Sequence, residues 1–507
     1  MDISDYRRDY AAYCSQIELA HYQHRAGFER ELHLESIYDR YGELFSRDSI
    51  DNLTRAYLET SEQRETERVG LHKLTGAARL GYLETQAREL SDECVRCSSS
   101  QRVEWQGESL PVNNVPKIIS NERDAQRRRE LTARWVDALS ACNDLRAARF
   151  ESMHASSLSL GFTSYRALLT EITGTDYERL SATTQKFLER TESAYTSALA
   201  QTIARDLPSV AFDELEHADY FYFQRAPHLA PLFPAEELIP TYAAAMKGFG
   251  IRVEQQKNIQ IDDAERPFKN PRAACFRINA PDDVRLLIAP VGGALDYTTL
   301  FHEVGHAQHF GGSSRELVKR YPEFLYPPEA ATTEGNAFLL SHLFLDADWL
   351  VEHRGGIGQT RAREVVGDLA LVVCSSIRRR CASLAYEIQL HDSPRVRSEQ
   401  LAMSFSDAIS NAMHFRRAPA LYLTEVDDDF YSASYLRAWA FEASLREYLK
   451  TRYGRRWWAS RKCGDELIDL WNTSSRYTVE ELARLIGFGE ISFELLADNL
   501  IAAMKED

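Results

Sequence analysis

Residues 299 to 309 read Thr-Leu-Phe-His-Glu-Val-Gly-His-Ala-Gln-His. His302 and His306 are four positions apart, so on a helix their imidazoles lie one above the other and can bind one Zn²⁺. Glu303 is rotated away from that pair but can still reach a metal-bound water as a general base. The pattern therefore predicts a catalytic zinc site, with one zinc ion per chain as the cofactor.

A catalytic zinc site needs a third protein ligand and a fourth position left open for water. The chain offers Glu329, in the segment Pro-Pro-Glu-Ala-Ala-Thr-Thr that ends at Thr333. We therefore expect His302, His306 and Glu329 as the metal ligands. His309 lies near the same helix face, and we expect it to hydrogen-bond or pack near the site, because four protein ligands suit a structural zinc better than a catalytic one.

The sequence around the motif predicts a short strand, a turn and a helix, which is the order a zinc peptidase needs. The predicted elements are a strand over 284–288, a glycine turn at 292–293, a helix over 297–310 capped by Asp296, and a glycine stop at 311–312. Residues 251–254 and 274–278 are also β-prone. These segments predict a small antiparallel sheet beside the zinc helix.

Most of the remaining chain has apolar residues at three- and four-residue steps, as amphipathic helices do. The segment 102–112 is an exception and predicts a hairpin around Gly107. The expected fold is mainly α, with the small sheet beside the active-site helix. We expect an N-terminal helical lobe over 1–205 and a catalytic zinc-peptidase domain with a C-terminal helical lobe over 206–507.

Composition argues against nucleic-acid and membrane partners. The 507 residues carry a net charge of −16, which disfavours binding to phosphates. No run approaches the ~18 apolar residues of a membrane helix, and the first residues show no apolar signal segment. The eight cysteines are scattered, as expected of reduced thiols, and the Cys94-x-x-Cys97 pair is expected to be incidental. A cytoplasmic location is therefore expected.

With these residues assembled, the chain resembles the thimet oligopeptidase and oligoendopeptidase F family of zinc peptidases. Residues 299–309 and the segment Glu329-Ala-Ala-Thr-Thr333 carry the resemblance, which is specific over about 205–445. It implies that His302, His306 and Glu329 bind zinc and that Glu303 is the base. It also implies a two-lobed helical body with a deep channel, which restricts substrates to short unstructured peptides.

The chain departs from the family next to the third ligand. Family members usually carry an acidic residue seven positions after that ligand, where it supports a zinc histidine, and here the position holds Asn336. The Asn336 carbonyl could still accept a hydrogen bond from an imidazole N–H, but without a full charge. Glu334 is expected to be a poor substitute, because it lies roughly 140° from Glu329 around an ideal helix.

A second departure concerns the family's substrate-binding segment, which faces the zinc with a histidine and several tyrosines. Tyr431 and Tyr435 keep the spacing of two family tyrosines, so the resemblance implies that they stabilise the oxyanion. The family's histidine has no clear match, and His414 is the nearest one.

The leading hypothesis is a zinc-dependent oligopeptidase that cleaves internal bonds of short peptides, with the strand around 285–289 pairing with the substrate by edge addition. Two alternatives stay open. One is a metallocarboxypeptidase, in which Arg437 or Arg285 would bind the terminal carboxylate, although either could be a surface or structural arginine. The other is a non-catalytic zinc-containing protein that binds peptides.

The long helical segments on both sides of the motif generate a prediction about substrate size. If they wall a cleft, folded chains are excluded, because an extended backbone must enter to reach the metal. We expect cleavage of peptides of about 5 to 20 residues, since an extended chain spans ~3.3 Å per residue. Mass spectrometry of products from synthetic peptides and from a native globular protein tests this. Efficient internal cutting of the native protein would show an open site.

Overall fold

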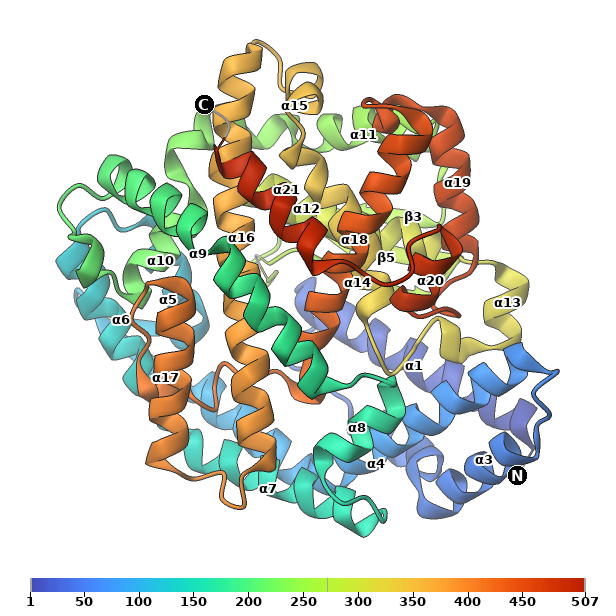
Figure 1. The fold of residues 1–507 in the computed structure, drawn as a ribbon. Helices are drawn as coiled ribbons and strands as arrows, with labels where there is room; N and C mark the ends of the chain where they lie inside the picture. Colours follow the sequence, from blue (N-terminus) through green and yellow to red (C-terminus); the bar gives the residue numbers. More distant parts are fainter. Residues whose placement is uncertain (1, 271, 506–507) are drawn as a thin grey trace. The chain divides into compact units, whose positions relative to one another are not determined.

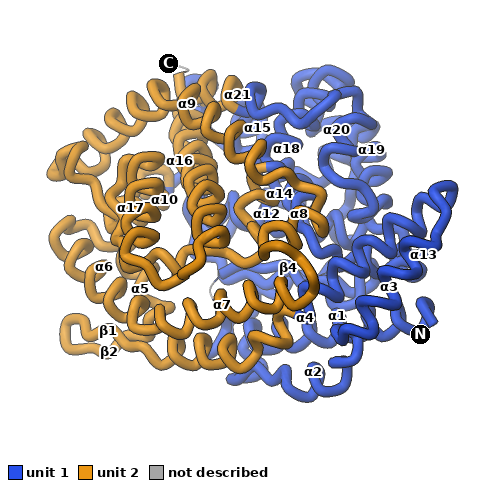
Figure 2. Tube along the Cα trace, turned by 60° about the horizontal axis from the view of Figure 1, so that its bottom comes forward, with its two compact units in different colours: residues 1–82, 230–362, 437–496 blue, residues 83–229, 363–436, 497–507 orange. Residues whose placement is uncertain are grey.

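The computed structural model describes residues 2–270 and 272–505 and is mostly helical (Figure 1). The mainly α fold with a small sheet is confirmed. The chain forms two compact units, and each unit combines three segments (Figure 2). Unit 1 comprises residues 1–82, 230–362 and 437–496, and unit 2 comprises 83–229, 363–436 and 497–507. None of these boundaries coincides with the one expected between residues 205 and 206.

Unit 1 contains the segment with the histidine motif. Its elements are α1 (Ile3–Arg25), α2 (Glu35–Tyr41), α3 (Arg47–Glu59), α11 (Leu238–Gly248), β3 (Ile259–Asp262), β4 (Ala274–Asn279), β5 (Asp283–Leu287), α12 (Ala294–Gly311), α13 (Arg315–Arg320), α14 (Ala331–Ser341), α15 (Ala347–His353), α19 (Arg461–Asn472) and α20 (Val479–Leu485).

Unit 2 is helical apart from one hairpin. It contains β1 (Arg102–Trp105), β2 (Glu108–Pro111), α5 (Val115–Asn121), α6 (Ala125–Ser140), α7 (Asn143–Ser159), α8 (Tyr165–Thr173), α9 (Tyr177–Asp206), α10 (His217–Arg225) and α17 (Glu399–Met413). The hairpin β1–β2 is the one predicted around Gly107. Helices that contain residues of both units are α4 (Glu65–Ser100), α16 (Gln359–Asp392), α18 (Tyr431–Tyr453) and α21 (Phe493–Lys505).

The sheet of unit 1 has three strands in the order β3-β5-β4. β4 and β5 form the predicted antiparallel pair, whereas β3 runs parallel to β5. The predicted strand over 251–254 is wrong, because residues 253–255 form a 3-10 turn and the third strand comes later, at Ile259–Asp262. β5 is the central strand, with partners on both edges, so the prediction that residues 285–289 offer a free edge to a substrate is also wrong.

α12 begins earlier than the sequence suggests and ends where expected. Gly292 and Gly293 have φ values of 82° and 97°, and the helix starts at Ala294. Asp296 therefore lies in the first turn instead of at the cap, and its carboxylate accepts from the backbone N–H groups of Val291 (2.8 Å) and Gly292 (2.9 Å). This closes the glycine turn onto the helix that carries the histidines.

A close contact between α12 and α14 determines how these two helices pack in unit 1. A Cβ on Gly305 would lie 2.4 Å from the Cα of Ala337 and 2.7 Å from the carbonyl oxygen of Asn336. Such distances are shorter than any normal contact, so only glycine permits the two backbones to approach this closely. Every residue of α14 is buried. The contact therefore holds the middle of α14 against the histidine helix.

Unit 2 contains a disulfide that the sequence did not predict. Cys97, in α4, is bonded to Cys142, 45 residues later. The expectation of eight reduced thiols is therefore wrong for this pair, since sequence spacing does not show which distant residues meet. The other six cysteines, including Cys94, are free. Among the described residues, no helix has the length and apolar character that crossing a bilayer requires.

The Gly305 contact makes a prediction for stability. Gly305→Ala should destabilise the protein by about 1–3 kcal/mol, because the added methyl group collides with the backbone of α14. Gly42→Ala is a matched control: Gly42 is exposed, has φ −55° and ψ −31°, and a Cβ there meets nothing within 4 Å. The control should be neutral or slightly stabilising. Thermal unfolding followed by circular dichroism compares them, and equal stability of the two variants would contradict the packing argument.

Candidate metal centre

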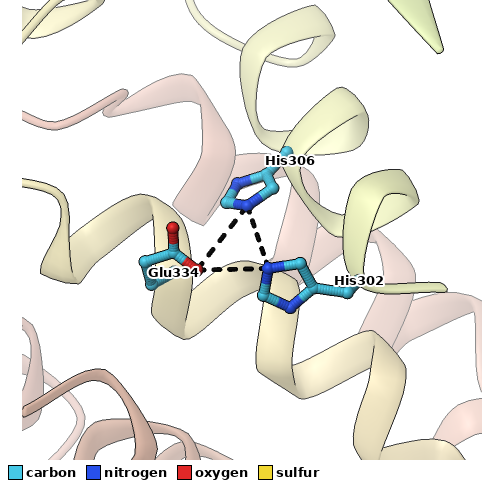
Figure 3. Close-up of side chains that lie close together, drawn as sticks. All are labelled: His302, His306 and Glu334. Carbon is cyan, nitrogen blue, oxygen red and sulfur yellow. Dashed lines mark hydrogen bonds and ion pairs between the residues drawn. The ribbon is translucent and has the colours of Figure 1, made fainter. Parts of the chain in front are cut away.

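Three side chains of unit 1 converge on one point: His302 and His306 from α12 and Glu334 from α14 (Figure 3). The Nε2 atoms of the two histidines are 3.2 Å apart, and Oε2 of Glu334 lies 3.2 Å from Nε2 of His302 and 3.6 Å from that of His306. No other three His, Cys, Asp or Glu side chains converge in this way within residues 2–270 and 272–505.

The group fits zinc in both donor type and spacing. Two imidazole nitrogens and one carboxylate oxygen form a donor set found in catalytic zinc sites. Ligands about 2.0–2.1 Å from a tetrahedral zinc are about 3.3 Å from one another, close to the observed separations. Burial lowers the pKa of His306 to about 4, which favours the neutral imidazole that a metal ligand needs. For His302, burial is outweighed by the hydrogen bond and charge of Glu334, which raise the pKa of the imidazole.

The structure does not bring Glu329 into this group. Glu329 lies just before α14, and its Oε1 accepts from Nη1 of Arg437 (3.0 Å) and from the backbone N–H of Ala331 (2.8 Å). The angle of roughly 140° expected between Glu329 and Glu334 requires both residues to lie on one helix. The helix begins only at Ala331, so Glu329 lies outside it, and Glu334 occupies the position expected for Glu329.

Glu303, next to the site, interacts with a strand of the sheet. The backbone of Cys275, in β4, interacts with its carboxylate and favours the charged form. Burial raises the pKa of Glu303 above its ordinary value, and the charge of His302 opposes this. A carboxylate with a raised pKa is better matched to accepting a proton near neutral pH.

A hydroxyl group orients one of the two histidines. Nδ1 of His306 lies 2.8 Å from Oγ1 of Thr333, the residue before Glu334. With its Nδ1–H donated to that oxygen, His306 presents the Nε2 lone pair to the metal position. No spacing in the sequence indicates this role of Thr333, apart from its place one residue before a ligand.

Asn336 does not support a ligand histidine, contrary to what its place after Glu329 suggested. Its amide nitrogen lies 3.3 Å from Nδ1 of His309, and its carbonyl oxygen accepts from Nε1 of Trp471 at 3.1 Å. His309 is buried, and burial lowers its pKa to about 3. His309 therefore packs and hydrogen-bonds behind the ligand pair, as expected, and is not one of the three converging side chains.

Tyr431 and Tyr435 belong to unit 2, at the start of α18. Their ring centroids are 5.0 Å apart, and the guanidinium of Arg380 lies 4.8 Å from the centroid of Tyr435. The two phenols thus share one side of the helix, as their spacing predicted. Their part in the chemistry stays a prediction. His414, also in unit 2, is 2.9 Å from Glu192 and 3.3 Å from Thr196.

No family model matches the sequence, and no curated protein does. Solved structures match it over almost its whole length. A Bacillus anthracis protein described as an oligoendopeptidase F superposes with a TM-score of 0.65 at 14% identity, over 97% of this chain and 88% of that one. The chain has the oligoendopeptidase fold. PZ peptidase A with an inhibitor superposes equally well, with a TM-score of 0.65 at 13% identity, over 98% of this chain and 90% of that one.

The identity between this chain and the two oligoendopeptidase-fold structures is so low that the likeness establishes the fold alone. The assignment of metal ligands and of a chemical reaction therefore has to be argued from the side chains of this chain.

The geometry of the three converging side chains predicts which glutamate would hold a zinc ion. Glu334→Gln should weaken zinc binding by at least about a hundredfold, because it removes a charged ligand. Glu329→Gln is the matched control and should retain one zinc per chain. Metal analysis after dialysis and a competition titration with a chelator measure both, with circular dichroism to verify folding. Loss of zinc in Glu329→Gln but not in Glu334→Gln would overturn the assignment.

Proposed function

We propose that this protein is a zinc-dependent oligopeptidase that hydrolyses internal bonds of short unstructured peptides and binds one zinc ion per chain. The convergence of His302, His306 and Glu334 beside Glu303 carries the proposal. The oligoendopeptidase fold supports a peptidase. Peptides are therefore the proposed substrates.

Each residue of the site has a chemical task in this proposal. His302, His306 and Glu334 would hold Zn²⁺, which when bound supplies a Lewis acid for the scissile carbonyl and for a water molecule. Glu303 takes the proton of the attacking water and passes it to the leaving amine. The backbone of Cys275 favours the charged form of Glu303, which is the form that accepts a proton. Tyr435 and Tyr431 remain candidates for donating to the oxyanion.

We propose β4, in place of β5, as the strand that pairs with the substrate backbone. β4 lies at an edge of the sheet, and the backbone of Cys275 interacts with the Glu303 carboxylate. An extended peptide added along this edge would lie close to the general base, which is where the scissile bond has to be.

The contacts of the two candidate arginines argue against the carboxypeptidase alternative. Arg437 donates to both carboxylate oxygens of Glu480 at 2.7 Å as well as to Glu329, and its side chain is only 5% exposed. Arg285 donates to both oxygens of Asp283, at 3.0 and 2.8 Å. Both guanidinium groups already bind carboxylates, so neither is available for a substrate terminus. The presence of Glu303 argues against a non-catalytic binder, which needs no base.

The proposal predicts the effect of removing the base. Glu303→Gln should lower kcat by about 10²–10⁴-fold, because it abolishes general base catalysis, while the zinc content stays at one per chain. Glu316→Gln, an exposed glutamate on α13, is the control and should keep the wild-type rate. Assays with quenched fluorescent peptides measure both.

The same assay separates endopeptidase from carboxypeptidase activity. Peptides with amidated C-termini should be cleaved as fast as peptides with free carboxylates. A wild-type rate in Glu303→Gln would refute the mechanism, and cleavage restricted to free carboxylates would establish a carboxypeptidase.

A further inference from the structure

Unit 1 contains a pocket of 830 Å³ that none of the metal-centre residues lines. Its walls are one face of α1, the residues around the start of α4, the turn between β4 and β5, and α13 with the 3-10 turn Pro322–Phe324 that follows it. The volume is that of a site for a small molecule.

The pocket lining has a charge opposite to that of the whole chain. Six lining residues are cationic and only two, Glu67 and Asp282, are acidic. The chain as a whole carries a net charge of −16. The cationic residues are Arg7, Arg8, Arg64, Arg315, Lys319 and Arg320. A cleft lined by one sign of charge concentrates the field and attracts ions of the opposite sign.

Three of the six cations are already neutralised by carboxylates. Arg7 is buried; Nη1 donates to Glu67 at 2.9 Å, and Nε and Nη2 donate to Glu323 at 3.0 and 2.7 Å. Arg315 is paired with Asp282, and Arg8 with Asp5. Arg7 therefore fixes the position of the α1 wall, and these three side chains contribute little net charge.

Of the other three cations, Lys319 and Arg320 lack a close counter-charge, and Arg64 has only a long ion pair. Lys319 and Arg320 are exposed and form no ion pair with any residue in 2–270 or 272–505. The nearest carboxylate to Arg64 is that of Glu67, at 3.9 Å, and Glu67 is already bonded to Arg7. A helix dipole stabilises cations in the last turn of a helix, which explains the presence of Lys319 and Arg320 at the end of α13. It does not explain the presence of Arg64. Arg64 directly precedes the N-terminus of α4, where the dipole disfavours a cation.

We infer that this pocket binds a small organic phosphate. Guanidinium groups bind phosphate oxygens in pairs, and Lys319 adds a point charge beside Arg320. Apolar lining residues, among them Ile3, Val318 and Leu325, provide a surface for the organic part of the ligand. A nucleic acid fits less well, because its long phosphate backbone would meet the negative charge of the rest of the chain. This inference does not depend on the proposed peptidase activity.

Isothermal titration calorimetry of the full chain with ADP tests the inference. The double variant Lys319→Glu/Arg320→Glu reverses the two unpaired charges of α13. Arg461→Glu/Lys462→Glu is the matched control, since it reverses two adjacent exposed cations at the start of α19, outside the pocket. We expect ADP to bind the wild type and the control alike and to bind the α13 variant at least about tenfold more weakly. Raising the salt concentration should weaken binding to the wild type.

Two results would overturn the inference. The first is the absence of ADP binding to the wild type. The second is equal binding to the α13 and α19 variants, which would place the nucleotide elsewhere, for example at the metal centre. Circular dichroism of both double variants verifies that they are folded.

Discussion

The absence of a side chain at Gly305 is the constraint on which the site depends. A Cβ at that position would lie 2.4 Å from the Cα of Ala337, so any other residue would force α12 and α14 apart. His302 and His306 come from α12, and Glu334 comes from α14. The three ligand atoms therefore converge only because the two helices meet backbone to backbone, and the chemistry of the site follows from this packing.

Two polar contacts lie behind the ligand pair. Thr333 lies against Nδ1 of His306, and Asn336 links His309 to Trp471. These contacts hold the histidine rings from the side opposite the metal position. The neutral hydroxyl of Thr333 contacts a ligand histidine where the family resemblance implies an acidic partner, so His306 is oriented without an additional negative charge.

The place of a residue in the site could be predicted from the sequence where local spacing determines it. It could not be predicted where it depends on tertiary contacts. The histidine pair, the adjacent Glu303 and the glycine end of α12 follow from helix geometry. The approach of Glu334 does not, because it depends on α14 beginning at Ala331 and on its packing against Gly305. Likewise, no local pattern shows that β5 is the central strand or that Cys97 meets Cys142.

Crystallography of the zinc-loaded protein, with data at the zinc absorption edge, tests whether α12 and α14 together build a zinc site. We expect one anomalous peak, about 2.0–2.2 Å from Nε2 of His302, Nε2 of His306 and a carboxylate oxygen of Glu334. A peak coordinated by Glu329 in place of Glu334, or no peak between the two histidines, would contradict it.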